Sequence, residues 1–97
     1  AIRDLENTLR RVRKEKGEDA PEAAEALNNL AALYRAQGRL TEAEPLYRRA
    51  LAILESKLGP SHSNTRTVAK NLATLLKSSG RPDEANAVLK KINAGTR

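Results

Sequence analysis

The chain has 97 residues, enough for one small domain with a modest core. It carries a net charge of +6, from 18 Lys and Arg against 12 Asp and Glu, and its only aromatic residues are two tyrosines. The absence of cysteine excludes a disulfide framework and thiolate chemistry, and no stretch approaches the roughly 20 apolar residues of a membrane helix.

A cysteine-free chain fits a reducing compartment, so we expect a cytoplasmic protein with no membrane association. The positive charge favours acidic partners and gives some non-specific attraction for nucleic acid. No signal peptide is visible, but because the chain begins at Ala1 and not at a methionine, we expect a fragment or a processed form of a longer protein.

Glycines recur every 21 residues, at Gly17, Gly38, Gly59 and Gly80. A glycine just beyond a helix adopts, at little cost, the left-handed conformation that ends the helix. Together with apolar residues at helical spacing, these stops predict an all-α fold. The expected helices span residues 1–16, 20–37, 41–58, 63–79 and 83–93.

The expected helix starts carry N-terminal signals. Asp19 precedes Pro21 at the start of the second helix. Thr41 and Glu44 have the spacing of a capping box at the third. Asp83 is the expected N-cap of the fifth. Short loops between such helices force neighbouring helices to run antiparallel.

The sequence repeats with a period of 42 residues. A shift by 42 places residues 29–31 (Asn-Leu-Ala) on residues 71–73, which are also Asn-Leu-Ala, and places Gly-Arg at 38–39 on Gly-Arg at 80–81. A recurrence of this length is typical of a solenoid of stacked helix pairs. Tyr34 and Tyr47 lie on the apolar stripes of their helices, so we expect both in the core.

Several segments resemble the 42-residue tetratricopeptide repeat of the kinesin light chain type. They are Ala-Leu-Asn-Asn-Leu-Ala-Ala-Leu-Tyr at 26–34, Gln-Gly-Arg at 37–39, the helix start at 42–51 and the loop at 58–62. The resemblance covers nearly the whole chain and implies an α-α superhelix of about five helices in antiparallel hairpins. It also implies that the first helix of each pair lines a concave groove that holds a segment of a partner.

This resemblance divides residues 1–97, taken as a single domain fragment, into three parts. Residues 1–19 match the second half of a preceding repeat, and residues 20–61 match one full repeat. Residues 62–97 match a degenerate final repeat and tail, in which Ala69 and Lys70 replace Leu-Asn and Leu76 replaces the usual tyrosine.

The leading functional prediction is a protein–protein interaction module in a larger multidomain protein. Its binding groove would follow one stripe of the second helix and the repeat-equivalent stripe of the fourth. An asparagine amide in such a stripe can both donate to and accept from the backbone of a bound peptide. A solvated helix face, or a structural bond made by Asn29 and Asn71, explains the same pattern. The predicted groove residues are Glu25, Asn28, Asn29, Ala32, Arg35, Thr67, Lys70, Asn71, Thr74 and Lys77.

Arg35, Lys70 and Lys77 would make this groove positive, which favours a protein or peptide with acidic residues or a C-terminal carboxylate. The alternative function is a structural spacer that stacks or self-associates through open ends. The apolar residues expected at those ends are Leu5, Leu9, Val12, Val88, Leu89 and Ile92.

Other classes of function find little support. The basic run from Arg10 to Lys16 has no neighbouring aromatic residue, which disfavours nucleic-acid binding. His62 is the only histidine and has no adjacent metal ligands or catalytic partners. The family resemblance places a histidine in this loop, which implies that His62 makes a structural bond there. The sequence therefore predicts neither an enzyme, nor a catalytic residue, a metal site or a cofactor.

Overall fold

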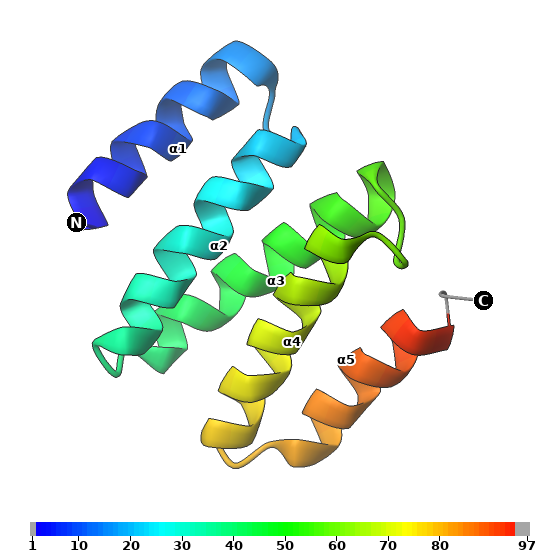
Figure 1. Ribbon diagram of the computed structural model, residues 1–97. Coiled ribbons are helices and arrows are strands. Elements are labelled where there is room, and N and C mark those ends of the chain that lie inside the picture. Colours follow the sequence, from blue (N-terminus) through cyan, green and yellow to red (C-terminus); the bar gives the residue numbers. More distant parts are fainter. Residues whose placement is uncertain (1, 95–97) are drawn as a thin grey trace.

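A computed structural model describes residues 2–94 and contains five α-helices and no strand within that range (Figure 1). The all-α prediction is confirmed; the predicted start at residue 1 lies outside the described residues, and every other predicted helix end lies within one residue of the observed one. No helix in the described range is long and apolar enough to cross a membrane. The helices are α1 (Ile2–Lys16), α2 (Pro21–Ala36), α3 (Leu40–Lys57), α4 (Ser63–Ser78) and α5 (Pro82–Ala94).

The helices lie side by side in chain order, and each runs antiparallel to the one before it (Figure 1). Each helix packs mainly on its sequence neighbours, in a body whose Cα extents are 34 × 31 × 15 Å. The starts of α2 and α4 are 42 residues apart, as are those of α3 and α5. The period found in the sequence is therefore a structural period.

The turns after α2 and α4 are copies of one another. Gly38 has a φ of 78° and Gly80 a φ of 75°, both in the left-handed region that favours glycine. In each turn the amide of the next arginine donates to a carbonyl near the helix end, from Arg39 to Tyr34 and from Arg81 to Leu76, both at 2.8 Å. These matched stops set the register between successive helix pairs.

The two predicted side-chain caps, Thr41 with Glu44 and Asp83, are wrong, whereas Pro21 begins α2 as predicted. The N-caps of α2 and α3 are Ala20 and Arg39, and neither makes a side-chain capping bond. Thr41 lies inside α3, and Asp83 is the second residue of α5. The physical reason at α5 is that the helix begins at Pro82, whose fixed φ suits the first helical position, so that Asp83 falls inside the helix.

His62 provides the side-chain cap that sequence analysis did not assign. Its Nδ1 accepts a hydrogen bond of 3.1 Å from the backbone N–H of Asn64, in the first turn of α4. The expectation of a structural bond for this histidine is therefore confirmed.

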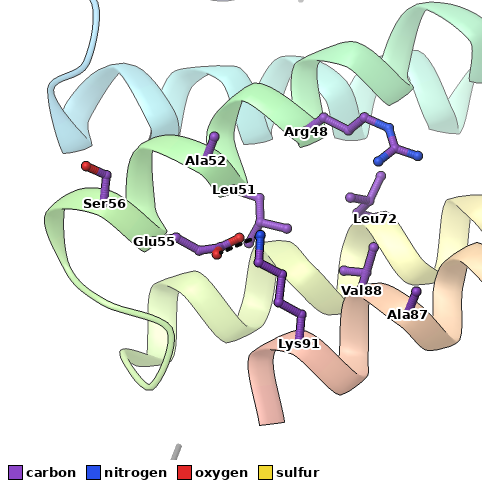
Figure 2. A pocket seen from close by; sticks show the side chains of 9 residues that line it. All are labelled: Arg48, Leu51, Ala52, Glu55, Ser56, Leu72, Ala87, Val88 and Lys91. Carbon is purple, nitrogen blue, oxygen red and sulfur yellow. Dashed lines mark ion pairs between the residues drawn. The ribbon is translucent and has the colours of Figure 1, made fainter. Parts of the chain in front are cut away.

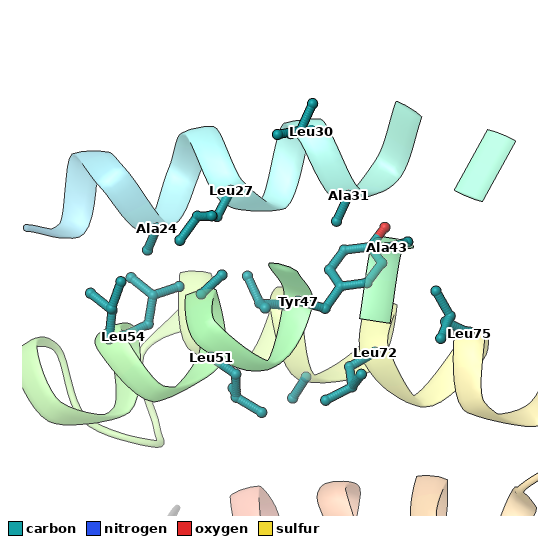
Figure 3. Close-up of a cluster of buried hydrophobic side chains, with 14 of the residues drawn as sticks. Ala24, Leu27, Leu30, Ala31, Ala43, Tyr47, Leu51, Leu54, Leu72 and Leu75 are labelled. Carbon is teal, nitrogen blue, oxygen red and sulfur yellow. The ribbon is translucent and has the colours of Figure 1, made fainter. Parts of the chain in front are cut away.

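The core is built from alanines and leucines between α2, α3 and α4 (Figure 3). Ala24, Leu27 and Ala31 of α2 point towards α3, where Tyr47 is the largest fully buried side chain. The small alanines allow the two helices to approach closely, and the tyrosine ring fills the space that remains. Its hydroxyl is buried without a hydrogen-bond partner, and burial raises the pKa of Tyr47.

Tyr34, expected in the core, lies only at its edge. Its ring is half-buried beneath the guanidinium of Arg39, which is 4.5 Å from the ring centroid. Its hydroxyl donates to Oε2 of Glu6 at 3.4 Å. The phenol can thus reach the surface near α1, whereas Tyr47 is enclosed between α2 and α4.

The end helices expose less apolar surface than the sequence suggested. Leu9 and Ile92 are buried, Leu5, Val12, Val88 and Leu89 are half-buried, and no large apolar side chain within residues 2–94 is exposed. The apolar end faces on which the spacer hypothesis depended are therefore small.

The Tyr47 side chain gives a direct test of this core. We expect Tyr47→Phe to leave the free energy of unfolding unchanged or raise it by up to about 1 kcal/mol, because it removes an unpaired buried hydroxyl. We expect Tyr47→Ala to lower it by about 3–5 kcal/mol through the cavity it leaves. Urea denaturation followed by circular dichroism measures both. A loss above about 1 kcal/mol in Tyr47→Phe would mean that the hydroxyl has a partner after all.

Candidate functional site

A cleft of about 290 Å³ opens between α2 and α4, with Leu54 of α3 among its lining residues. We call this the α2–α4 cleft. Three predicted groove residues line it, Glu25 and Asn28 from α2 and Thr67 from α4. The structure thus brings together residues 42 apart in sequence, Glu25 with Thr67, as the period requires. The other lining residues are Pro21, Glu22, Asn64 and Val68.

An amide pair joins the two helices that form this cleft. Nδ2 of Asn71 donates to Oδ1 of Asn28 at 3.1 Å, and both side chains are partly buried. Each amide keeps a polar group for another partner, the NH₂ of Asn28 and the carbonyl oxygen of Asn71. Asn29, by contrast, is exposed. The alternative of a structural bond therefore applies to Asn71 and not to Asn29.

The two predicted groove threonines are engaged within their own helix. The hydroxyl of Thr67 donates to the carbonyl of Ser63, and that of Thr74 to the carbonyl of Lys70, each at 2.9 Å. These hydroxyls can still accept hydrogen bonds from a ligand, but their protons are occupied. Ala32 is half-buried and adds a small apolar surface.

Charge along the α2–α4 face is polarised rather than uniformly positive. Glu22 and Glu25 lie near the start of α2, whereas Arg35 lies in its last turn. On α4, Lys70 lies near the middle and Lys77 in the last turn. Among the described residues, none of these side chains has an ion-pair partner within 4 Å. The distribution complements the dipole of each helix, and it also leaves unpaired charges of opposite sign at the two ends of the face.

A network of ion pairs on the other side of the molecule links α3 to α5. Arg81 bonds both Glu44 and Glu84, and Arg48 lies 2.9 Å from Glu44 and 3.4 Å from Glu84. Hydrogen bonding from Arg81, and then from Arg48, holds the pKa of Glu44 below its usual range. Arg81 likewise lowers the pKa of Glu84, and the two carboxylates raise the pKa of Arg81.

The sequence does not reveal this network, because the spacing of Thr41 and Glu44 fits a capping box. The one available signal was that Arg81 and Glu84 repeat the earlier pair Arg39 and Glu42, which also bond each other. The described residues contain no group of three or more side chains able to hold a metal ion.

The family model of the tetratricopeptide repeat matches residues 1–56 and again residues 22–92. The chain belongs to the tetratricopeptide repeat family. A search of curated proteins gave no match. Among solved structures, BtubC (BKLC) from P. vanneervenii superposes with a TM-score of 0.86 at 24% sequence identity. The match covers 99% of this chain and 37% of BtubC, and at that identity it shows the fold alone.

The tetratricopeptide repeat (TPR) is a module for protein–protein interaction, so this chain is a TPR interaction module. Its 42-residue helix pairs stack into the expected superhelical solenoid. The boundaries predicted for the half repeat, the full repeat and the degenerate repeat stay predictions, as does the assignment of groove residues.

The low pKa of Glu44 predicts how stability depends on pH. Its folded-state pKa lies below that of the unfolded chain, about 4.3, so its contribution is fully present above that pH and is lost as the pH falls through the folded-state value. We expect Glu44→Gln to unfold at a lower temperature than the wild type at pH 7, with a gap that closes below about pH 4. Thermal melts across pH measure this gap. A gap that stayed constant down to the lowest pH would contradict the assigned role of the carboxylate.

Proposed function

We propose that the α2–α4 face of this TPR domain binds an extended segment of a partner protein that carries an acidic residue or a C-terminal carboxylate. The observation that supports this most is the set of unpaired basic side chains, Arg35, Lys70 and Lys77, on the same face as a cleft with free amide groups. Binding, and not catalysis, is the function typical of the family.

The polarity of the face suggests an orientation for the bound segment. Its acidic end would lie near the last turns of α2 and α4, beside Arg35 and Lys77. Its other end would lie near Glu22 and Glu25, which favour a basic side chain or a backbone N–H. The free NH₂ of Asn28 and the free carbonyl of Asn71 lie between these ends and can hold the segment's backbone.

Each exposed charge pair would contribute only about 0.2–1 kcal/mol, so several must act together and the affinity must fall with salt.

A place in a larger multidomain protein and a cytoplasmic location belong to this proposal, and they rest on the composition and the short span of the chain relative to BtubC.

Charge reversal at the basic end tests the proposed groove. We expect Arg35→Glu with Lys77→Glu to weaken binding of an unstructured peptide of aspartate, glycine and serine by about tenfold at low salt, because two attractions become repulsions. Fluorescence anisotropy with the labelled peptide measures the affinity.

The matched control is Arg11→Glu with Lys90→Glu, two exposed positions outside the clefts described, with the same change in net charge. This control should retain most of the wild-type affinity. Equal losses in both double variants would show a non-specific effect of net charge, and wild-type affinity in the first variant would show that the groove is not the site.

A further inference from the structure

Two further clefts open on the face opposite the proposed groove. One, of about 580 Å³, lies between α1 and α3 over α2; the other, of about 630 Å³, lies between α3 and α5 over α4 (Figure 2). We call them the α1–α3 and α3–α5 clefts. They are copies related by the 42-residue period. Their matching apolar residues are Leu9, Leu30 and Leu46 in the first and Leu51, Leu72 and Val88 in the second.

The α3–α5 cleft neutralises its own charges. Glu55 and Lys91 face each other across it at 3.5 Å, the ion pair drawn in Figure 2. Arg48, at its edge, is bound by Glu44 and Glu84. A charged ligand entering this cleft would have to displace existing ion pairs.

The α1–α3 cleft carries a different charge at the same positions. Arg10 and Arg13 stand where the second cleft has Ala52 and Glu55. Within residues 2–94, the side chain of Arg10 bonds the side-chain oxygen of Asn7, at 3.3 Å, and forms no ion pair. The Nε of Arg13 is buried without an acceptor. A buried guanidinium N–H without an acceptor is unfavourable, and a ligand carboxylate would stabilise the charge of Arg13 by pairing with the part of its side chain that lines the cleft.

Two acidic residues, Glu6 and Glu42, also line this cleft, and neither forms an ion pair with Arg10 or Arg13 among the described residues. Glu6 accepts from the hydroxyl of Tyr34, and Glu42 is paired with Arg39. In the described part of the chain, Arg10 and Arg13 have no carboxylate within 4 Å. They lie beside the apolar side chains of Leu9, Leu30 and Leu46. We call the two arginines the basic margin of the cleft.

We propose that the α1–α3 cleft is a second docking surface, which binds an acidic amphipathic helix of a partner protein. Leucine-type side chains of that helix would contact Leu9, Leu30 and Leu46, and its Asp or Glu residues would pair with Arg10 and Arg13. The cleft lies between two helices that run in the same direction, which suits a helix laid along a groove. Since this cleft has α2 behind it and the α2–α4 cleft has α3 behind it, the two surfaces can be occupied together.

The probe is a synthetic helix of roughly 15 residues, made of leucine at three- and four-residue spacing and glutamate elsewhere. We expect it to shift amide resonances of Leu9, Arg13 and Leu46 in ¹H–¹⁵N spectra of the whole chain, and to leave Glu55 and Lys91 unshifted. The same peptide with glutamine in place of every glutamate should bind at least about tenfold more weakly.

Two variants complete the test. Arg10→Glu with Arg13→Glu should weaken the acidic helix at least about tenfold, whereas Arg11→Glu with Lys90→Glu should not. Ala52→Arg with Glu55→Arg transfers the basic margin to the α3–α5 cleft and should create a second binding site in a titration by calorimetry. The second variant keeps the test decisive if the first does not fold.

The proposal is overturned if the shifts fall on the α2–α4 face, if the glutamine peptide binds equally well, or if the transferred arginines create no new site. Failure of the groove proposal is a separate result, because that proposal is tested by the Arg35→Glu, Lys77→Glu variant and by an extended peptide that contains no leucine.

Discussion

The packing of α3 between α2 and α4 is the constraint on which both faces of the molecule depend. Tyr47 and the surrounding alanines hold α3 close to α2, and Leu54 of the same helix lines the α2–α4 cleft. Leu46 and Leu51 of α3 line the two clefts on the other side. A shift of this one helix would alter all three clefts at once, because close-packed interiors transmit displacement.

Repetition of the helix pair produces similar clefts, and differences in charge distinguish them. In the α3–α5 cleft, the acidic and basic residues form ion pairs with one another, and these pairs join α3 to α5. In the α1–α3 cleft and along the α2–α4 face, basic side chains lack such partners and are available to a ligand. A solenoid can thus use the same backbone geometry for internal cohesion at one position and for recognition at another, and only side-chain identity decides between them.

The sequence predicted the helices well because their signals are local. Glycine stops and apolar periodicity each act within one helix, and the 42-residue recurrence then fixes the order of stacking. The predicted caps are wrong because α3 begins at Leu40, ahead of Thr41, and α5 begins at Pro82, ahead of Asp83. The position of Tyr34 at the edge of the core could not be predicted from its own helix, because its ring and hydroxyl contact Arg39 and Glu6, which lie outside α2. The pairing of Glu44 with Arg81, across 37 positions, and the unequal charge of the two repeated clefts needed three-dimensional placement.

Native-state hydrogen exchange tests the central position of α3 most directly. α2, α3 and α4 each pack on a helix at both sides, whereas α1 and α5 pack on one; because α3 is the only one of the three inner helices that has no end helix beside it, the account predicts the slowest amide exchange in the middle of α3. Exchange should be intermediate in α2 and α4 and fastest in α1 and α5. Amides of α3 that exchanged as fast as those of α1 would contradict the claim that this helix holds the clefts in place.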